Sequence, residues 1–338
     1  MRAPGFWWQT ERGLKARLLA PLGTLAGAVA AARLGRPGAE AVLPVLCVGN
    51  PTVGGSGKTP TALYLAERLA ADGHRVAFLT RGYGGRLSGP LAVDPARHGA
   101  DEVGDEALLL ARAAPTFLAR DRAAGARAAA ATDASLIIMD DGFQNPSLAK
   151  SLSLLVIDAA VGVGNGLCLP AGPLRAPLGP QLARAGAVLL VGEGAPGDAV
   201  ARAAAAAGLP VLRGRLVPAP ERAARLAGRR LLAFAGIGRP EKFFATLREI
   251  GAETVECVAF PDHHRFTEAE ALGLLARAER AGLTPATTEK DAVRLAASAG
   301  GRRLLAAGEV LPVRLELDAA SAARLDALIV ALAAMIRR

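Results

Sequence analysis

Apolar residues in this chain fall into short unbroken runs instead of alternating with polar ones. Such runs occupy positions 45–48, 76–79, 136–139, 187–191 and 231–235, and a similar run at 152–157 is interrupted only by Ser153. Between them lie longer stretches rich in Ala, Arg, Leu and Glu, with the spacing expected of helices. A strand that is apolar on both faces belongs inside a parallel sheet, and alternating helices cover the two faces of that sheet. The pattern therefore predicts an α/β fold built on parallel sheets.

The first 36 residues follow a different pattern. Residues 18–32 carry no charge, have basic residues on both sides, and follow closely after Trp7 and Trp8. As a helix this segment would reach about 22 Å, which is short of a hydrocarbon core of about 30 Å. Tryptophan rings favour the headgroup level of a bilayer. We therefore expect a helix lying on a membrane surface, with a soluble docking helix or a cleaved signal peptide as alternatives.

The run at 45–48 ends in a glycine-rich turn, and a helical pattern follows the turn. Strand, loop and helix in this order are the setting of a phosphate-binding P-loop, whose usual form is GxxxxGK[ST]. Here Lys58 would reach the β- and γ-phosphates, Thr59 would bind Mg²⁺, and Thr52 replaces the usual first glycine. The predicted nucleotide-binding residues are Thr52, Val53, Gly54, Gly55, Ser56, Gly57, Lys58, Thr59 and Pro60. The motif predicts a protein that binds a nucleoside triphosphate with Mg²⁺.

Acidic residues follow two later segments. Asp140 and Asp141 end the run at 136–139, where P-loop enzymes place an aspartate that holds Mg²⁺. Adjacent side chains on a strand point to opposite faces, so one of the two is expected to face the metal, and the sequence leaves open which. Asp105 and Glu106 open a helical run, where they act either as helix caps or as a general base.

Basic residues and histidines supply the remaining candidates. Arg81 and Arg86 lie in the segment RGYGGR after a predicted strand, and Arg175 lies in the Gly/Pro-rich stretch LPAGPLRAPL. Ligands collect at such strand ends in open α/β sheets, so these arginines are candidates for a substrate phosphate. His263 lies in FPDHHRFT, where a hydrogen-bonded catalytic role is favoured over a zinc site because no third ligand accompanies the pair.

Composition narrows the class of partner. The net charge of +9 calls for an anionic partner, but aromatic residues make up only 4% of the chain. Stacking platforms for single-stranded nucleic acid and known nucleic-acid-binding signatures are missing from the sequence. A membrane surface or a phosphorylated substrate is therefore favoured over nucleic acid.

The order of the motifs is more specific than any one of them. VGNPTVGGSGKTP is followed by RGYGGR, VGDEA, DDGFQ, LPAGPLRAPL, FPDHHRFT and TTEKDAVRL. From about Phe6 to Arg294 this series resembles the tetraacyldisaccharide 4′-kinase family, the lipid A 4′-kinases. The resemblance implies transfer of the γ-phosphate of ATP, with Mg²⁺, to the 4′-hydroxyl of an anionic glycolipid, tetraacyldisaccharide 1-phosphate. It also implies a peripheral enzyme of lipopolysaccharide synthesis on the cytoplasmic face of the bacterial inner membrane.

The resemblance assigns roles to particular residues. It makes Asp105 the catalytic base, His263 its partner and Lys58 the third catalytic residue. Asp140 and Asp141 match the acidic pair of the family, and Arg175 matches the arginine of the family's Gly-Pro-Leu-Arg motif. Asn145 departs from the family pattern, in which many members have histidine, and this puts an essential role for that position in doubt.

Three domains are expected: a membrane-surface helix in 1–36, a P-loop kinase core in 37–180, and a smaller α/β lobe in 181–338 that contributes His263. The main alternative is a membrane-attached P-loop ATPase of the partitioning type. Such ATPases carry an additional early lysine in the loop, and this chain has none there. A soluble small-molecule kinase and a non-enzymatic nucleotide-binding module are less favoured, because they would not explain the N-terminal segment or the Asp105 and His263 motifs.

Overall fold

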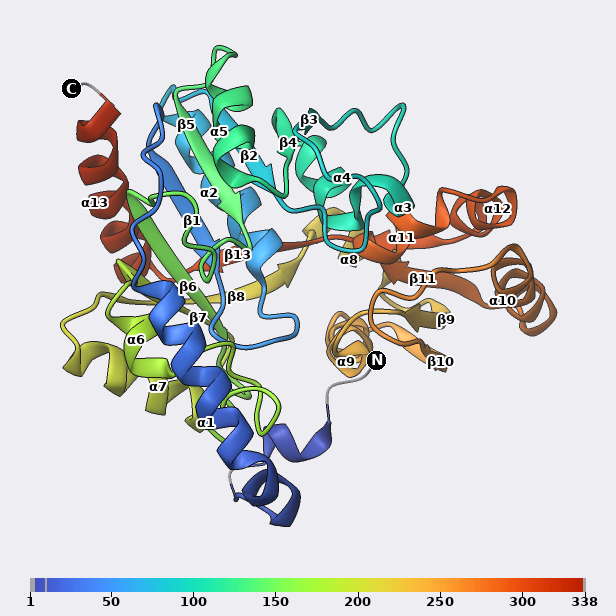
Figure 1. The fold of residues 1–338 in the computed structure, drawn as a ribbon. Helices are drawn as coiled ribbons and strands as arrows, with labels where there is room; N and C mark the ends of the chain where they lie inside the picture. Colours follow the sequence, from blue (N-terminus) through green and yellow to red (C-terminus); the bar gives the residue numbers. More distant parts are fainter. Residues whose placement is uncertain (1–3, 10, 337–338) are drawn as a thin grey trace.

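The computed structural model describes residues 4–9 and 11–336, so residues 1–3 of the expected N-terminal domain, residue 10 and residues 337–338 lie outside the described residues. Two sheets organise the chain (Figure 1). The first has nine strands in the order β13-β8-β7-β6-β1-β5-β2-β4-β3, and the second has four in the order β10-β9-β11-β12. The predicted α/β fold is confirmed.

Nearly all strand pairs are parallel, as the unbroken apolar runs predicted. Within the described residues, only β13 and β3 run antiparallel to their neighbours. The strands of the first sheet are β1 (Val45–Gly49), β2 (Val76–Thr80), β3 (Leu91–Ala92), β4 (Thr116–Leu118), β5 (Leu136–Asp140), β6 (Leu152–Asp158), β7 (Ala187–Val191), β8 (Val211–Pro218) and β13 (Val313–Leu317). Those of the second sheet are β9 (Arg230–Ala235), β10 (Glu253–Ala259), β11 (Thr284–Thr288) and β12 (Glu309–Leu311).

Helices cover both faces of each sheet. On one face of the first sheet the apolar core includes residues of α1 (Leu14–Leu34), α5 (Arg122–Ala130), α6 (Leu178–Leu182) and α7 (Ala195–Ala206). On the other face lie α2 (Lys58–Ala71), α4 (Asp105–Ala111) and α13 (Ala319–Ile336). The second sheet packs between α8 (Pro220–Leu226) with α9 (Pro240–Glu249), and α10 (Glu268–Ala281) with α11 (Glu289–Leu295) and α12 (Ala299–Ala307). Short helices η1 (Gly5–Trp8) and α3 (Ala100–Val103) complete the described elements.

The sheets divide the chain differently from the expected boundary at 180/181. β7, β8 and β13 belong to the first sheet, so the chain leaves this lobe after β8 and returns at β13. The second lobe is therefore an insertion between Pro218 and Val313. The composition of the Gly/Pro-rich stretch is typical of either a loop or a domain seam. It folds as a loop against α1 and the P-loop, and its chain reversals need Gly and Pro.

Helix α1 is longer than the uncharged segment from which it was predicted, because Leu14 to Arg17 add a first turn. Leu14, Leu18, Leu22, Leu25 and Val29 are all more than half exposed. The opposite face of α1 packs closely against the loop at 168–171 through Gly23 and Gly27, where a larger side chain would collide with that loop. Within the described residues, α1 is also the one helix whose length and apolar composition would allow it to cross a membrane.

Candidate active site

The loop between β1 and α2 has the backbone of a phosphate cradle. Gly54 and Gly57 have φ angles of 102° and 93°, a region that favours glycine, and Gly57 directly precedes the first residue of α2. Asn50 Nδ2 donates to the carbonyl of Gly54 at 3.1 Å, and Lys58 Nζ donates to Asn50 Oδ1 at 3.2 Å. The amide groups at the start of a 14-residue helix are thus presented to an anion.

Asp140 and Asp141 have opposite surroundings. Asp140 is fully buried at the end of β5, and its Oδ1 has no hydrogen-bond partner among the described residues. Asp141 instead accepts two hydrogen bonds from the Arg175 guanidinium, at 3.0 and 3.2 Å, and lies 3.7 Å from Lys58 Nζ. Its φ of 51° lies outside the range of a strand, and β5 ends at the residue before it, Asp140.

These surroundings shift the pKa values of the two carboxyl groups in opposite directions. Burial, followed by the charge of Glu106, raises the pKa of Asp140 to about 7. Burial also acts to raise the pKa of Asp141, but the charges of Lys58 and Arg175 outweigh it and lower that pKa. Asp140 forms no ion pair within the described residues, whereas Asp141 is already paired with Arg175 and Lys58.

The residues present fit a Mg²⁺ ion that is shared with a bound nucleotide. Asp140 offers an unpaired carboxylate oxygen, and the buried Ser56 and Thr59 offer hydroxyl groups in the P-loop, of which Ser56 Oγ has no partner in the described chain. No cluster of three His, Cys, Asp or Glu able to hold a metal occurs within 4–9 and 11–336. Mg²⁺ in phosphoryl-transfer enzymes needs only one or two protein ligands, because phosphates and water complete its shell.

Arg175 braces the P-loop as well as Asp141. Its Nε donates to the carbonyl of Thr52 at 3.1 Å, and its backbone amide donates to the carbonyl of Pro51 at 2.9 Å. The amide of Val53 donates to Pro173 on the same loop. The structure thus brings Arg175 to the P-loop, with its guanidinium engaged by Asp141.

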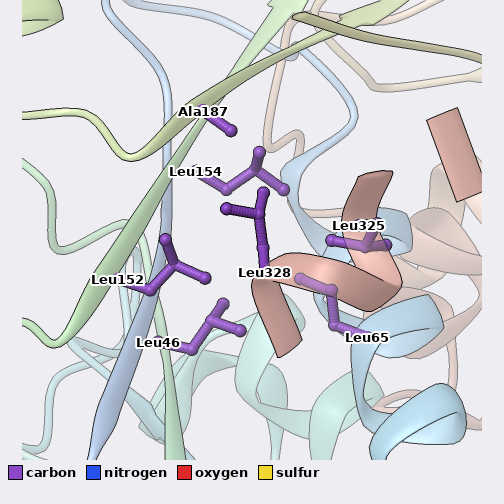
Figure 2. Close-up of a pocket in the computed structure, with 7 residues that line it drawn as sticks. All are labelled: Leu46, Leu65, Leu152, Leu154, Ala187, Leu325 and Leu328. Atoms are coloured by element: carbon purple, nitrogen blue, oxygen red, sulfur yellow. The ribbon is translucent and has the colours of Figure 1, made fainter. Parts of the chain in front are cut away.

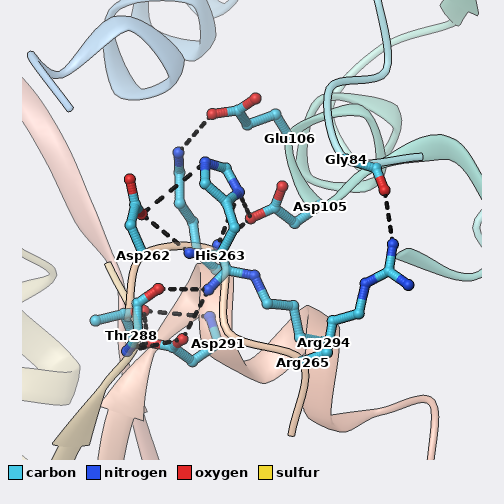
Figure 3. A network of polar contacts seen from close by, with 11 residues as sticks. Gly84, Asp105, Glu106, Asp262, His263, Arg265, Thr288, Asp291 and Arg294 are labelled. Atoms are coloured by element: carbon cyan, nitrogen blue, oxygen red, sulfur yellow. Dashed lines mark hydrogen bonds and ion pairs between the residues drawn. The ribbon is translucent and has the colours of Figure 1, made fainter. Parts of the chain in front are cut away.

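The second group of predicted site residues lies between the lobes (Figure 3). Asp105 begins α4, is 3% exposed, and follows Gly104, whose φ is 85°. His263 projects from the loop between β10 and α10, and its Nδ1 lies 3.5 Å from Asp105 Oδ2. Arg294 of α11 contacts the same oxygen. The two residues predicted as base and partner therefore meet, although 158 positions separate them in the sequence.

Electrostatics favours an ionised Asp105. Burial acts to raise its pKa, but the hydrogen bond to His263 and the charges of Lys290 and Arg294 lower it well below the usual range. The same contact raises the pKa of His263 against the opposing effect of burial. Beside this pair, Lys290 Nζ donates to Glu106 Oε1 at 2.7 Å.

A second polar contact joins the lobes on the other side of the P-loop. Asp158 ends β6, and its Oδ2 lies 2.7 Å from Arg239 Nη1 and 2.6 Å from Lys242 Nζ. A side chain on the adjacent Gly238 would come within 3.6 Å of the Gly55 amide, so the second lobe passes close to the P-loop. Asp158 could have been found as a strand-end aspartate, whereas its two partners carry no motif.

The remaining predicted substrate residues lie less centrally. Arg81 is exposed just after β2, and Arg86 pairs with Glu102 on the surface. A cavity of about 10 Å³ between the first sheet and helices α2 and α13 is lined only by leucine and alanine side chains (Figure 2). It offers no polar group and plays no part in the site.

Comparison with known proteins agrees with this geometry. The family profile for tetraacyldisaccharide-1-P 4′-kinase matches residues 15–330. The chain belongs to this family. It is 60% identical over 332 residues to tetraacyldisaccharide 4′-kinase of Methylobacterium nodulans, covering 98% of this chain and 96% of the relative. It is 57% identical over 334 residues to the protein of that name from Xanthobacter autotrophicus, covering 97% and 96%.

A solved structure of the family has the same fold. The "apo" form of LpxK from Aquifex aeolicus, crystallised in complex with ATP, matches with a TM-score of 0.69 at 25% identity. The match covers 94% of this chain and 99% of the Aquifex chain. The expected family and fold class are therefore confirmed.

Proposed function

We propose that this chain transfers the γ-phosphate of ATP to the 4′-hydroxyl of tetraacyldisaccharide 1-phosphate in lipid A biosynthesis. The observation that carries the proposal is the meeting of Asp105 and His263 between the lobes, close to a P-loop, in a chain of this family. A P-loop by itself would serve an ATPase equally well. A buried, ionised carboxylate paired with an imidazole supplies what a hydroxyl acceptor additionally needs, a place for its proton.

At the nucleotide end, the P-loop amides and Lys58 bind the phosphates of ATP. Thr59 and Asp140 are the residues that would hold Mg²⁺, which when bound supplies charge neutralisation to the β- and γ-phosphates. Asp141 and Arg175 keep the loop in shape through the bidentate pair that joins them. Arg81 and Arg86 are positioned to meet the anionic acceptor only from the outer part of the site.

At the acceptor end, the hydroxyl oxygen attacks the γ-phosphorus, the bond to the β–γ bridging oxygen breaks, and ADP leaves. The hydroxyl proton passes to Asp105 and its partner His263. Because the pKa of Asp105 is lowered and that of His263 is raised, the imidazole is the more stable final place for the proton. The two groups titrate as a coupled pair.

The exposed face of α1 supports a place at a membrane surface. Five large apolar side chains lie on that face, and Lys15 and Arg17 precede Leu18 near the start of the helix. An exposed apolar face with basic residues beside it suits a peripheral protein on anionic lipid. We place the enzyme on the cytoplasmic face of the inner membrane, where ATP and the acylated acceptor meet.

The test is phosphate transfer from γ-labelled ATP to detergent-dispersed tetraacyldisaccharide 1-phosphate, with Mg²⁺ or with EDTA. The proposal expects a labelled lipid only with Mg²⁺, carrying its new phosphomonoester at the 4′ position by ³¹P NMR. Release of labelled phosphate without labelled lipid would favour the partitioning-type ATPase. Nucleotide-driven dimerisation would then be the next property to measure.

A further inference from the structure

Arg294 is the most heavily engaged cation between the lobes (Figure 3). Its side chain is only 6% exposed. Its Nη1 donates to the carbonyl of Gly236 at 2.7 Å and to Asp291 Oδ1 at 2.9 Å, while its Nη2 contacts Asp105 Oδ2. One guanidinium therefore bonds the catalytic carboxylate of the first lobe and two groups of the second lobe.

The same interaction set holds His263. The carbonyl of Gly236 also accepts the backbone amide of His263 at 3.1 Å. His263 has a φ of 56°, a conformation that is uncommon for residues other than glycine and that needs support from its surroundings. The imidazole Nδ1 lies 3.5 Å from Arg294 Nη2. Arg294 and His263 are thus fixed to each other through one carbonyl as well as through Asp105.

Asp291 holds both Arg294 and Gly236 in place. It is fully buried, both of its oxygens accept the Gly236 amide at 3.1 Å, and Thr288 Oγ1 donates to it at 2.7 Å. Two buried carboxylates and a carbonyl therefore surround the guanidinium, which offsets the cost of burying its charge. Lysine could not make these contacts together, because it lacks the planar fork of arginine.

The two side-chain contacts of Asp105 are both made to the same carboxylate oxygen. Arg294 and His263 both approach Oδ2, whereas Oδ1 has no hydrogen-bond partner within the described part of the chain. The charged or titratable groups facing this carboxylate or its imidazole partner come from four segments. They are Glu106 on α4; Lys290, Asp291 and Arg294 on α11; Asp262 and His263 on the loop before α10; and Tyr83 after β2, whose ring centroid lies 5.1 Å from that of the imidazole. Lys290 is occupied by Glu106, so it does not replace Arg294.

We propose that Arg294 is a positioning residue for phosphoryl transfer, which turns Asp105 Oδ2 toward the second lobe, leaves Oδ1 for the acceptor hydroxyl, and holds Asp105 and His263 together across the two lobes. The inference rests on the proposed function. It adds a residue that neither touches the reacting atoms nor belongs to the P-loop. Its contribution acts through Asp105, and this can be measured directly.

The experiment compares Arg294→Gln, Arg294→Lys, Asp105→Asn and the double variants that combine each Arg294 change with Asp105→Asn. Arg302→Gln is the matched control, because Arg302 lies in the same lobe and its side chain donates to a single exposed carbonyl within the described residues. We expect Arg294→Gln to lower kcat about 100-fold, with the KM for ATP unchanged within about twofold. The acid limb of kcat/KM should move to higher pH, because the carboxylate loses its cation. In Arg294→Lys the acid limb should lie close to that of the unmodified protein, whereas kcat should stay lowered.

The double variant decides whether Arg294 acts through Asp105. In an Asp105→Asn background the Arg294 change should lower kcat little further, since the effects of residues that act as a unit are not additive. Full additivity, or an equal loss at every pH without a shifted acid limb, would overturn the proposal. If Arg294→Gln fails to fold, the Arg294→Lys cycle carries the same test, because it keeps the buried charge. An unmodified protein without lipid phosphorylation would instead refute the proposed function itself.

Discussion

Asp140→Asn should make the nucleotide-free protein more stable at alkaline pH in the absence of metal. Burial raises the pKa of Asp140 from 3.8 to about 7, so the folded protein holds a proton that the unfolded chain releases. Stability from this group is fully present below about pH 4 and is lost as the pH rises through 7. A rise of roughly three units at 1.36 kcal/mol each corresponds to about 4 kcal/mol lost between these limits.

Thermal unfolding in EDTA from pH 4.5 to 8.5 measures the effect. The advantage of Asp140→Asn over the unmodified protein should grow with pH, since asparagine keeps the shape and does not titrate. Mg²⁺ added together with ATP should stabilise the unmodified protein at pH 8 more than it stabilises the variant, because Asp140 adds a protein ligand to an ion that the phosphates also bind. Parallel pH dependence of the two proteins in EDTA would refute the reasoning.

The neighbouring aspartate provides a control of opposite sign. Asp141→Asn keeps the shape and tolerates the positive φ, but it leaves the Arg175 guanidinium without its carboxylate. Because the pKa of Asp141 is lowered in the folded protein, its contribution is present above its ordinary pKa and is lost as the pH falls. This variant should therefore lose about 1–3 kcal/mol of stability at pH 8, whether or not Mg²⁺ is present.

Three further predictions concern other parts of the molecule. Lys58→Ala should lower kcat by at least about 100-fold, because it removes a preorganised charge from the phosphates; near-normal turnover in the label-transfer assay would exclude the P-loop assignment. Leu18→Ser combined with Leu22→Ser should weaken sedimentation with anionic vesicles by more than tenfold and leave the melting temperature unchanged, because both side chains are exposed. Asp158→Asn should raise the radius of gyration measured by small-angle scattering, since it weakens a contact between the lobes; an unchanged radius would mean that this contact does not hold them together.

The sequence predicted most of the elements because their signals are local. Unbroken apolar runs identify central strands such as β5, and the glycines before Lys58 identify the P-loop. The boundary at 180/181 was wrong because Gly/Pro content reports chain reversals and not which sheet a strand joins. The pairing of β13 with β8 connects positions about a hundred residues apart, and periodicity carries no information about it.

The sequence predicted individual site residues only where a residue type in a given place is typical of one role. Strand-end aspartates indicated Mg²⁺, but the choice of Asp140 depends on the guanidinium that engages its neighbour from a distant loop. Arg294 was visible only as part of the motif TTEKDAVRL, to which the sequence alone assigned no role. Its importance comes from Gly236 and Asp105, which reach it from two different lobes.

The most direct test of the central claim is the stoichiometry of transfer. Labelled lipid and released ADP are counted in the same reaction with saturating tetraacyldisaccharide 1-phosphate and Mg²⁺. The account predicts one 4′-phosphorylated lipid for each ADP, and loss of both products together in Asp105→Asn. ADP released without an equivalent amount of phosphorylated lipid, at a rate that does not depend on Asp105, would contradict it.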